Sequence, residues 1–110
     1  MLYLTQETQI MLAIEPIDFR KQIDSLIVLC DQALSMNPRS GQLFIFINRS
    51  RSMIRVLCYE GGGYWLATKR LSRGRYALWP IKKGVVSEPV LASDLTKLLK
   101  TFVASSRKAR

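Results

Sequence analysis

Residues 42–70, QLFIFINRSRSMIRVLCYEGGGYWLATKR, contain three apolar runs separated by two turn signals. The first run, 42–48, is apolar on both faces, which is typical of a buried central strand. The second and third runs, 53–59 and 64–70, flank three successive glycines that permit the positive φ angles of a tight hairpin. The stretch therefore predicts three strands joined as a β-meander.

Periodic apolar residues on either side of this meander predict two helices. Apolar side chains recur at helical steps over 19–35, with Asp18 placed to cap the first turn and NPRSG, 37–41, placed to end the helix. A second set of leucines predicts a helix over 93–104, with Ser93 as its cap.

Two shorter strands complete the expected fold, one over 9–14 and a last one over 75–80. The fold class predicted is α+β: an antiparallel β-meander of three to five strands with an N-terminal helix and a C-terminal helix packed on one face. We expect residues 1–104 to form one domain and residues 105–110 to form a basic flexible tail.

Positive charge is concentrated in one third of the chain. The window 49–83 holds nine cations and a single acid, Glu60, in a chain whose net charge is +9. The loops at 49–52 and 71–75 each follow a strand whose partner runs the other way, so we expect both at the same end of the sheet. Guanidinium groups grip phosphate oxygens, and aromatic rings stack on unpaired bases. The predicted nucleic-acid-binding residues are Arg49, Arg51, Arg55, Lys69, Arg70, Arg73, Arg75, Lys82 and Lys83.

Each of these signals also has a purely structural explanation. Basic turns are exposed in any protein, so the charge can serve solubility alone. The apolar residues nearby are interpreted as core rather than as base-stacking platforms; they are Trp65, Leu66, Leu78 and Trp79. EGGG is interpreted as a hairpin rather than a phosphate cradle, because no strand, glycine loop and helix surround it in that order.

Several chemistries are excluded or disfavoured by residue type. The chain has no histidine, which excludes Ser-His and Cys-His catalysis and His-ligated metal sites. Cys30 and Cys58 stand alone in apolar runs, so we expect a reduced pair of core residues in a cytoplasmic protein. No apolar run is long enough to span a bilayer, and the first 20 residues show no positive leader.

The eight carboxylates do not suggest an active site. Two-metal phosphoryl transfer requires carboxylates that converge on ions about 3.5–4 Å apart. Asp24 and Asp31 lie one heptad apart on the expected helix, which is too far to share an ion. We expect Asp24 to pair with Arg20 or Lys21 on the adjacent turn. The chain is therefore predicted to be no enzyme and to need no metal or cofactor.

Three segments resemble the TnpB accessory family of IS-sixty-six-type insertion sequences, the product of their second open reading frame. They are DFRKQIDSL (18–26), SGQLFIFINR (40–49) and KRLSRGRYALWP (69–80), and the match runs in order from about residue 9 to residue 100. The chain departs from the family pattern at Arg55, Tyr59 and Glu60, where Lys, Trp and Asp are usual, and at Ser72, where Glu is frequent. The matching positions are Asp18, Arg20, Lys21, Asp24, Leu26, Pro38, Gly41, Leu43, Phe44, Phe46, Lys69, Arg70, Leu71, Gly74, Arg75, Tyr76, Trp79 and Pro80.

This resemblance implies a small protein that is encoded beside a separate, larger transposase and helps the element move, while catalysis belongs to the larger protein. The expected partners are DNA and that transposase, with no membrane contact. Three hypotheses follow: a DNA-binding accessory factor, an adaptor whose charge meets an acidic patch on the transposase, and, third, a metal-dependent nuclease. Sequence leaves the oligomeric state open.

Overall fold

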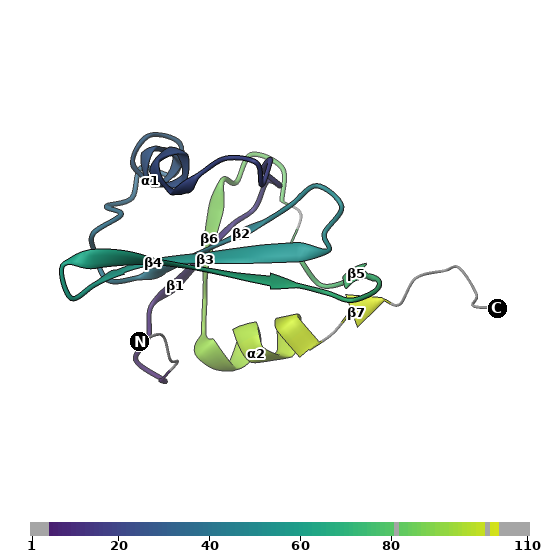
Figure 1. Cartoon of the computed structure of the whole chain (residues 1–110). Coiled ribbons are helices and arrows are strands. Elements are labelled where there is room, and N and C mark those ends of the chain that lie inside the picture. Colours follow the sequence, from purple (N-terminus) through teal and green to yellow (C-terminus); the bar gives the residue numbers. More distant parts are fainter. Residues whose placement is uncertain (1–4, 81, 101, 104–110) are drawn as a thin grey trace.

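The computed structural model describes residues 5–80, 82–100 and 102–103, and its main feature is a five-stranded sheet (Figure 1). The strand order across the sheet is β4-β3-β2-β1-β6. The expected basic tail, 105–110, lies outside the described residues. The strands of this sheet are β1 (Ile10–Ala13), β2 (Leu43–Ile47), β3 (Met53–Glu60), β4 (Gly63–Arg70) and β6 (Ser87–Val90).

Strand β2 lies at the centre of the sheet, as its composition predicts. All five of its residues are buried. Leu43, Ile45 and Ile47 contribute to one hydrophobic core, and Phe44 and Phe46 to the other. Because successive side chains of a strand point to opposite faces, an apolar residue at every position requires cover on both faces.

The prediction of an antiparallel meander is correct for β2, β3 and β4 and wrong for the sheet as a whole. Strand β1 pairs with β2 in parallel, with Ile10 opposite Leu43. Helix α1 (Ile23–Gln32) connects these two strands, and such a crossover carries the chain back to start β2 in the same direction as β1. Strand β6 then pairs antiparallel with β1 and forms the second edge, so the sheet is mixed.

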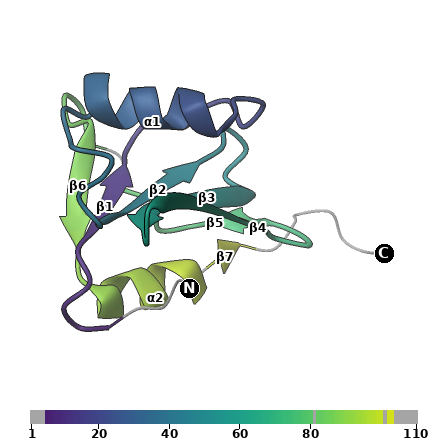
Figure 2. The same cartoon turned by 60° about the vertical axis from the view of Figure 1, so that its left-hand side comes forward.

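The two helices cover opposite faces of the sheet, not one face as expected (Figures 1 and 2). Leu26 and Cys30 of α1 pack with Phe44 and Phe46. Helix α2 (Ala92–Lys100) packs its buried Leu95 and Leu98 against the other side, with Ile10, Leu12 and Ile45 among the contacts. The double-sided apolar pattern of β2 explains this arrangement, since each face needs its own helix.

Helix α1 is shorter than the predicted 19–35, and neither of its expected boundaries is correct. Its N-cap is Gln22, which makes no side-chain capping bond, so the prediction that Asp18 caps the helix is wrong. The carboxylate of Asp18 instead accepts a 2.9 Å hydrogen bond from the backbone amide of Arg20, which holds a turn before the helix. At the other end the helix stops before Ser35, whose φ is +54°, well ahead of the segment 37–41.

Helix α2 also ends earlier than predicted. Residues 93–104 were expected to be helical, but α2 ends at Lys100, and Phe102–Val103 form strand β7; positions 101 and 104 lie outside the described residues. Ser93 lies inside the helix rather than capping it, because the amide of Leu95 already bonds to the carbonyl of Leu91.

The predicted strand 75–80 is reduced to β5 (Arg75–Tyr76), which pairs with β7 in a separate two-stranded sheet. The chain then leaves strand geometry because Trp79 turns into the core under β1. Its ring is 3% exposed, and its Nε1 donates a 3.1 Å hydrogen bond to the carbonyl of Ala13. A buried indole with a satisfied N–H anchors this segment without a strand partner.

Candidate nucleic-acid interface

The first basic loop, residues 48–52, connects β2 and β3 and is fixed by Asn48. The side-chain oxygen of Asn48 accepts hydrogen bonds from the amides of Ser52, at 2.9 Å, and Met53, at 3.1 Å. Arg51 adopts a φ of +62°, in the left-handed region that few residues with a side chain occupy. The Asn48 side chain thus bonds the amides of Ser52 and Met53 where the backbone turns, and these hydrogen bonds give the loop a defined shape.

The second basic loop, residues 71–74, follows β4 and is bonded to the first. The amide of Leu71 donates to the carbonyl of Ser52 at 2.9 Å, and the amide of Tyr76 donates to the carbonyl of Arg51 at 2.8 Å. Both loops therefore lie at the same end of the sheet, to the right in Figure 1, as predicted. We call this end, which comprises the loops 48–52 and 71–75 and the last residue of β4, Arg70, the basic end.

Four arginines of the basic end are exposed: Arg49, Arg70, Arg73 and Arg75. None of them forms an ion pair with another residue in the described part of the chain. Gly74 separates Arg73 from Arg75 at a φ of +83°, a conformation that favours glycine. Charge that is neither buried nor neutralised by neighbouring acids is available to an anionic partner.

A cavity of about 530 Å³ beside the basic end brings three more of the predicted cations together. Arg51, Lys82 and Lys83 line it, although they come from segments 31 residues apart in the chain. Two acids lie among these cations and were not anticipated: Glu15 lines the same cavity, and Glu88 forms an ion pair with Lys82. Nothing in the local sequence indicates these neighbours, because the tertiary fold alone brings them there.

Lys69 lies on β4 directly opposite Ile54 and therefore on the face that α2 covers elsewhere. It is exposed, as is Trp65 on the same face of the strand, with 46% of its surface accessible. The interpretation of Trp65 and Leu78 as core residues is therefore wrong; Leu78 is 47% exposed. The interpretation of Trp79 as core is correct, and Leu66 is partly buried against the α1-side core.

Arg55 differs from the other residues predicted to bind nucleic acid, because its guanidinium already contacts other parts of the protein. Its guanidinium lies over the ring of Phe19, 4.7 Å from the centroid, and its Nη1 donates a 2.9 Å hydrogen bond to the carbonyl of Lys21. These contacts tie the middle of β3 to the segment before α1. The side chain is partly buried, so we assign Arg55 a structural role.

In the segment before α1, Asp18 neutralises the charge of Arg20. Arg20 and Asp18 form a bidentate pair, with 3.0 and 2.7 Å between the guanidinium nitrogens and Oδ2. The hydrogen bond from the Arg20 side chain, and then that from its amide, lower the pKa of Asp18 to about 2. The expected pairing of Asp24 with Arg20 or Lys21 is wrong, because Arg20 turns to Asp18 and Lys21 has no ion pair within the described chain.

The remaining motif residues serve the fold. Gly41 takes a φ of +88° in the turn before β2, and Phe44 and Phe46 are buried in the core under α1. Tyr76 is buried beside Trp79 in the core on the α2 side, where Leu71 packs and Pro80 is half-buried. These residues hold the second loop against the body of the protein and so fix the positions of its arginines.

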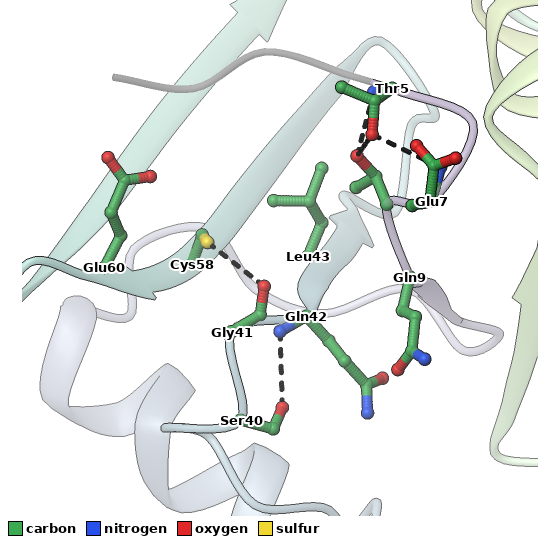
Figure 3. A pocket seen from close by; sticks show the side chains of 10 residues that line it. Thr5, Glu7, Gln9, Ser40, Gly41, Gln42, Leu43, Cys58 and Glu60 are labelled. Carbon is green, nitrogen blue, oxygen red and sulfur yellow. Dashed lines mark hydrogen bonds between the residues drawn. The ribbon is translucent and has the colours of Figure 1, made fainter.

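The opposite end of the sheet holds a largely polar pocket (Figure 3). A pocket of about 610 Å³ there is lined by hydroxyl and amide side chains together with Glu7, Glu60 and Cys58. The Cys58 thiol donates a 3.7 Å hydrogen bond to the carbonyl of Gly41. Burial and the nearby Glu60 raise the pKa of this thiol, so it is no activated nucleophile.

The described residues contain no group of three or more metal-ligating side chains. Both cysteines are free and buried, in agreement with the predicted reduced pair of core residues, and burial raises the pKa of Cys30 to about 12. Among the described helices, none has the length and hydropathy needed to cross a membrane. Within the described residues, exposed arginines without an ion pair are concentrated at the basic end.

Comparison with known proteins identifies a family model over almost the whole chain and two relatives over about seven tenths of it. The family model described as "IS66 Orf2 like protein" matches residues 8–108. The uncharacterized protein y4hO of Sinorhizobium fredii (strain NBRC 101917 / NGR234) is 38% identical over 79 residues, which cover 72% of this chain and 68% of that protein. The uncharacterized protein y4jC of the same strain is 33% identical over 78 residues, covering 71% and 67%. No solved structure matches the chain.

Proposed function

This chain belongs to the IS66 Orf2-like family, and from that premise we propose that it is a non-catalytic accessory protein of insertion-sequence transposition that binds DNA through its basic end. Its partners in this proposal are the DNA of the element and the element's separate transposase. The DNA contacts are made by Arg49, Arg51, Lys69, Arg70, Arg73, Arg75 and Lys83. Lys82 contributes less because Glu88 already pairs with it, and Arg55 contributes to stability instead.

The observation that carries the proposal is the joining of the two arginine loops by backbone hydrogen bonds. The Leu71–Ser52 and Tyr76–Arg51 bonds hold the arginines of both loops at one end of the sheet without using their side chains. Within the described chain, no ion pair with an acid engages the guanidinium groups of Arg49, Arg70, Arg73 or Arg75. Cations on an ordered backbone lose less entropy on binding than cations on a mobile tail.

The chemistry of the interface favours the phosphate backbone over base edges. Guanidinium forks match phosphate oxygens, and such contacts position a protein on DNA without reading sequence. Neither of the described helices carries an arginine, so the basic end presents no arginine-bearing recognition helix for the major groove. We therefore propose sequence-independent binding that depends strongly on salt concentration.

The test is DNA binding measured across a salt series, with the Arg70→Ala, Arg73→Ala and Arg75→Ala changes made singly and together. Each phosphate contact contributes about 0.9 to the negative slope of log affinity against log salt. The triple variant is expected to flatten that slope by about three contacts and to keep its thermal stability. Arg39→Ala is the matched control, because Arg39 lies over Tyr59 at the opposite end of the sheet.

Two outcomes separate DNA binding from an adaptor function. If the triple variant loses affinity on every DNA sequence while Arg39→Ala behaves as wild type, the proposal stands. If DNA binding is unchanged and co-purification with the transposase is lost, the basic end contacts protein and the adaptor hypothesis replaces it. Metal-dependent DNA cleavage by the purified chain would instead favour the nuclease hypothesis.

A further inference from the structure

Strand β4 is an edge strand of the five-stranded sheet, and its outer side pairs with no other strand among the described residues. It is eight residues long, contains no proline and pairs with β3 without interruption from Gly63 to Arg70. By contrast, the other edge, β6, is four residues long and contains Pro89. Long regular edges invite pairing with another strand, and proteins commonly protect them with proline, bulges or a short length.

The hydrogen bond from Leu71 to Ser52 fixes which backbone groups of β4 are free. In an antiparallel pair, residues alternate between those bonded to the partner strand and those whose N–H and C=O point away from it. Leu71 bonds toward β3, so the odd-numbered residues of β4 face β3. The even-numbered residues therefore direct their N–H and C=O groups outward; they are Tyr64, Leu66, Thr68 and Arg70.

The side chains along this edge follow a self-complementary order. The sequence YWLATKR, residues 64–70, begins with two aromatic residues, ends with two cations and has Ala67 at its centre. When two copies run antiparallel about Ala67, Trp65 lies opposite Lys69 and Tyr64 lies opposite Arg70. Both members of each pair share a face of the sheet, because the paired positions have the same parity. A cation over an aromatic ring stabilises such a cross-strand pair.

We propose that a second copy of this chain docks on β4, antiparallel and centred on Ala67, so that the two sheets become one continuous sheet. In this register the outward groups of Tyr64, Leu66, Thr68 and Arg70 all gain backbone hydrogen bonds. The 46% exposed ring of Trp65 gains a cover, which nothing in the described chain provides. The loops 48–52 and 71–75 remain outside the paired segment, whereas Lys69 and Arg70, which the proposed DNA interface also uses, lie within it. Pairing of the two strands is measured without DNA, so the two proposals are tested separately.

The lysines of the two paired strands do not lie close enough to prevent this association. Lys69 of one copy and Lys69 of the other lie on opposite sides of the centre, four strand positions apart, which is about 13 Å at roughly 3.3 Å per residue. That separation exceeds the Debye length of about 8 Å at physiological salt, so their repulsion is largely screened. An acidic peptide on the same edge would form ion pairs with the cations. It would not explain why two aromatic residues and two cations lie at equal distances from Ala67.

Disulfide cross-linking tests both the interface and its register. Ala67 and its symmetry mate form a non-hydrogen-bonded pair in the proposed dimer, with Cα atoms about 4.5 Å apart. This lies within the range of about 4.4–6.8 Å that a disulfide spans. Ala67→Cys is therefore expected to give a covalent dimer under mild oxidation. Trp65→Cys and Lys69→Cys are the matched controls, made in a Cys58→Ser background because Cys58 lies opposite Trp65. Neither cross-links to itself, whereas a mixture of the two does.

Sedimentation of the whole protein over a wide concentration range provides the second measurement. Thr68→Pro removes an outward N–H and leaves the β3 ladder intact, a place where edge strands tolerate proline. Wild type is expected to dimerise, and Thr68→Pro with an unchanged melting temperature is expected to remain monomeric. Should Thr68→Pro fail to fold, the cross-linking pattern decides alone.

Four results would overturn the proposal. The first is a wild-type chain that stays monomeric at every concentration, and the second is a dimer that a folded Thr68→Pro variant does not weaken. The third is cross-linking of Lys69→Cys to itself as efficient as that of Ala67→Cys. The fourth is a monomer whose β4 edge is filled by an acidic extended peptide, which would assign the edge to another protein.

Discussion

The backbone amide of Tyr76 donates a 2.8 Å hydrogen bond to the carbonyl oxygen of Arg51, and this bond joins two loops that are 25 residues apart in the chain. The Tyr76 ring is buried, so the bond is anchored on one side by the hydrophobic core. Arg51 on the other side has a left-handed φ that the loop around it must maintain. The position of the basic end thus depends on the packing of Tyr76 in the core.

Trp79 is predicted to be a major determinant of stability. Replacing it with alanine removes a ring that is 3% exposed and leaves the Ala13 carbonyl without its donor, so Trp79→Ala should cost about 3–5 kcal/mol. The measurement is the free energy of unfolding by denaturant titration. Leu78→Ala is the neighbouring control; its side chain is 47% exposed, and we expect a change within about 0.5 kcal/mol. Similar costs for both variants would contradict the buried position of the indole.

Arg55 is predicted to behave in the opposite way to the loop arginines. Arg55→Ala loses the 4.7 Å contact with the Phe19 ring and the 2.9 Å bond to the Lys21 carbonyl, so it should cost about 1–2 kcal/mol of stability. The salt slope of DNA binding should not change. Melting curves and salt titrations on the same sample check this, with Arg73→Ala as the comparison. A flattened slope with full stability would place Arg55 in the interface.

Asp18 is predicted to make stability depend on pH in the acid range. Its pKa in the folded protein is about 2, below the ordinary value of 3.8, because the carboxylate is paired with Arg20. A lowered pKa contributes stability above pH 4, and that contribution is lost as the pH falls through 4 toward 2. The difference in melting temperature between wild type and Asp18→Asn should therefore shrink over that interval. A difference that stays constant down to pH 2 would mean that the pair does not form.

Tyr76 is predicted to tolerate loss of its hydroxyl. The hydroxyl oxygen is buried and makes no hydrogen bond with the described residues, so Tyr76→Phe should be neutral or should stabilise the protein by about 1 kcal/mol. Burial also raises the pKa of Tyr76 above its ordinary value of 10.0. A raised pKa leaves stability intact below pH 10 and reduces it as the pH rises beyond 10, because only the unfolded chain ionises freely.

Alkaline unfolding followed by circular dichroism checks this prediction. Tyr76→Phe should lose less stability above pH 10 than wild type does. Some loss should remain, because burial raises the pKa of Cys30 to about 12 and acts in the same direction. A variant that is strongly destabilised at neutral pH would indicate that the hydroxyl has a partner.

Residues 42–70 by themselves determined the central part of the sheet. Five consecutive apolar residues specify a strand buried on both faces, and the three glycines 61–63 specify a hairpin between β3 and β4. The register of that hairpin was left open by the sequence and comes from the structure, in which Gly61 and Gly62 have φ values of +61° and +84°. The antiparallel order of β2 and β3 also places the loops 48–52 and 71–75 at one end. These features were predictable because they depend on contacts between neighbours in the chain.

The direction of β1, the addition of β6 and the opposite placement of the helices were decided only by the tertiary structure. A strand as short as Ile10–Ala13 can pair in either direction, and its direction here follows from the crossover through α1. The same holds for the individual cations: Arg55 and Arg73 were both predicted to bind nucleic acid, but only the fold shows that one lies over Phe19 and the other in solvent. Sequence determined how much charge the chain carries, whereas long-range packing decided which of its cations remain free to bind, because burial and ion pairing depend on residues far apart in the chain.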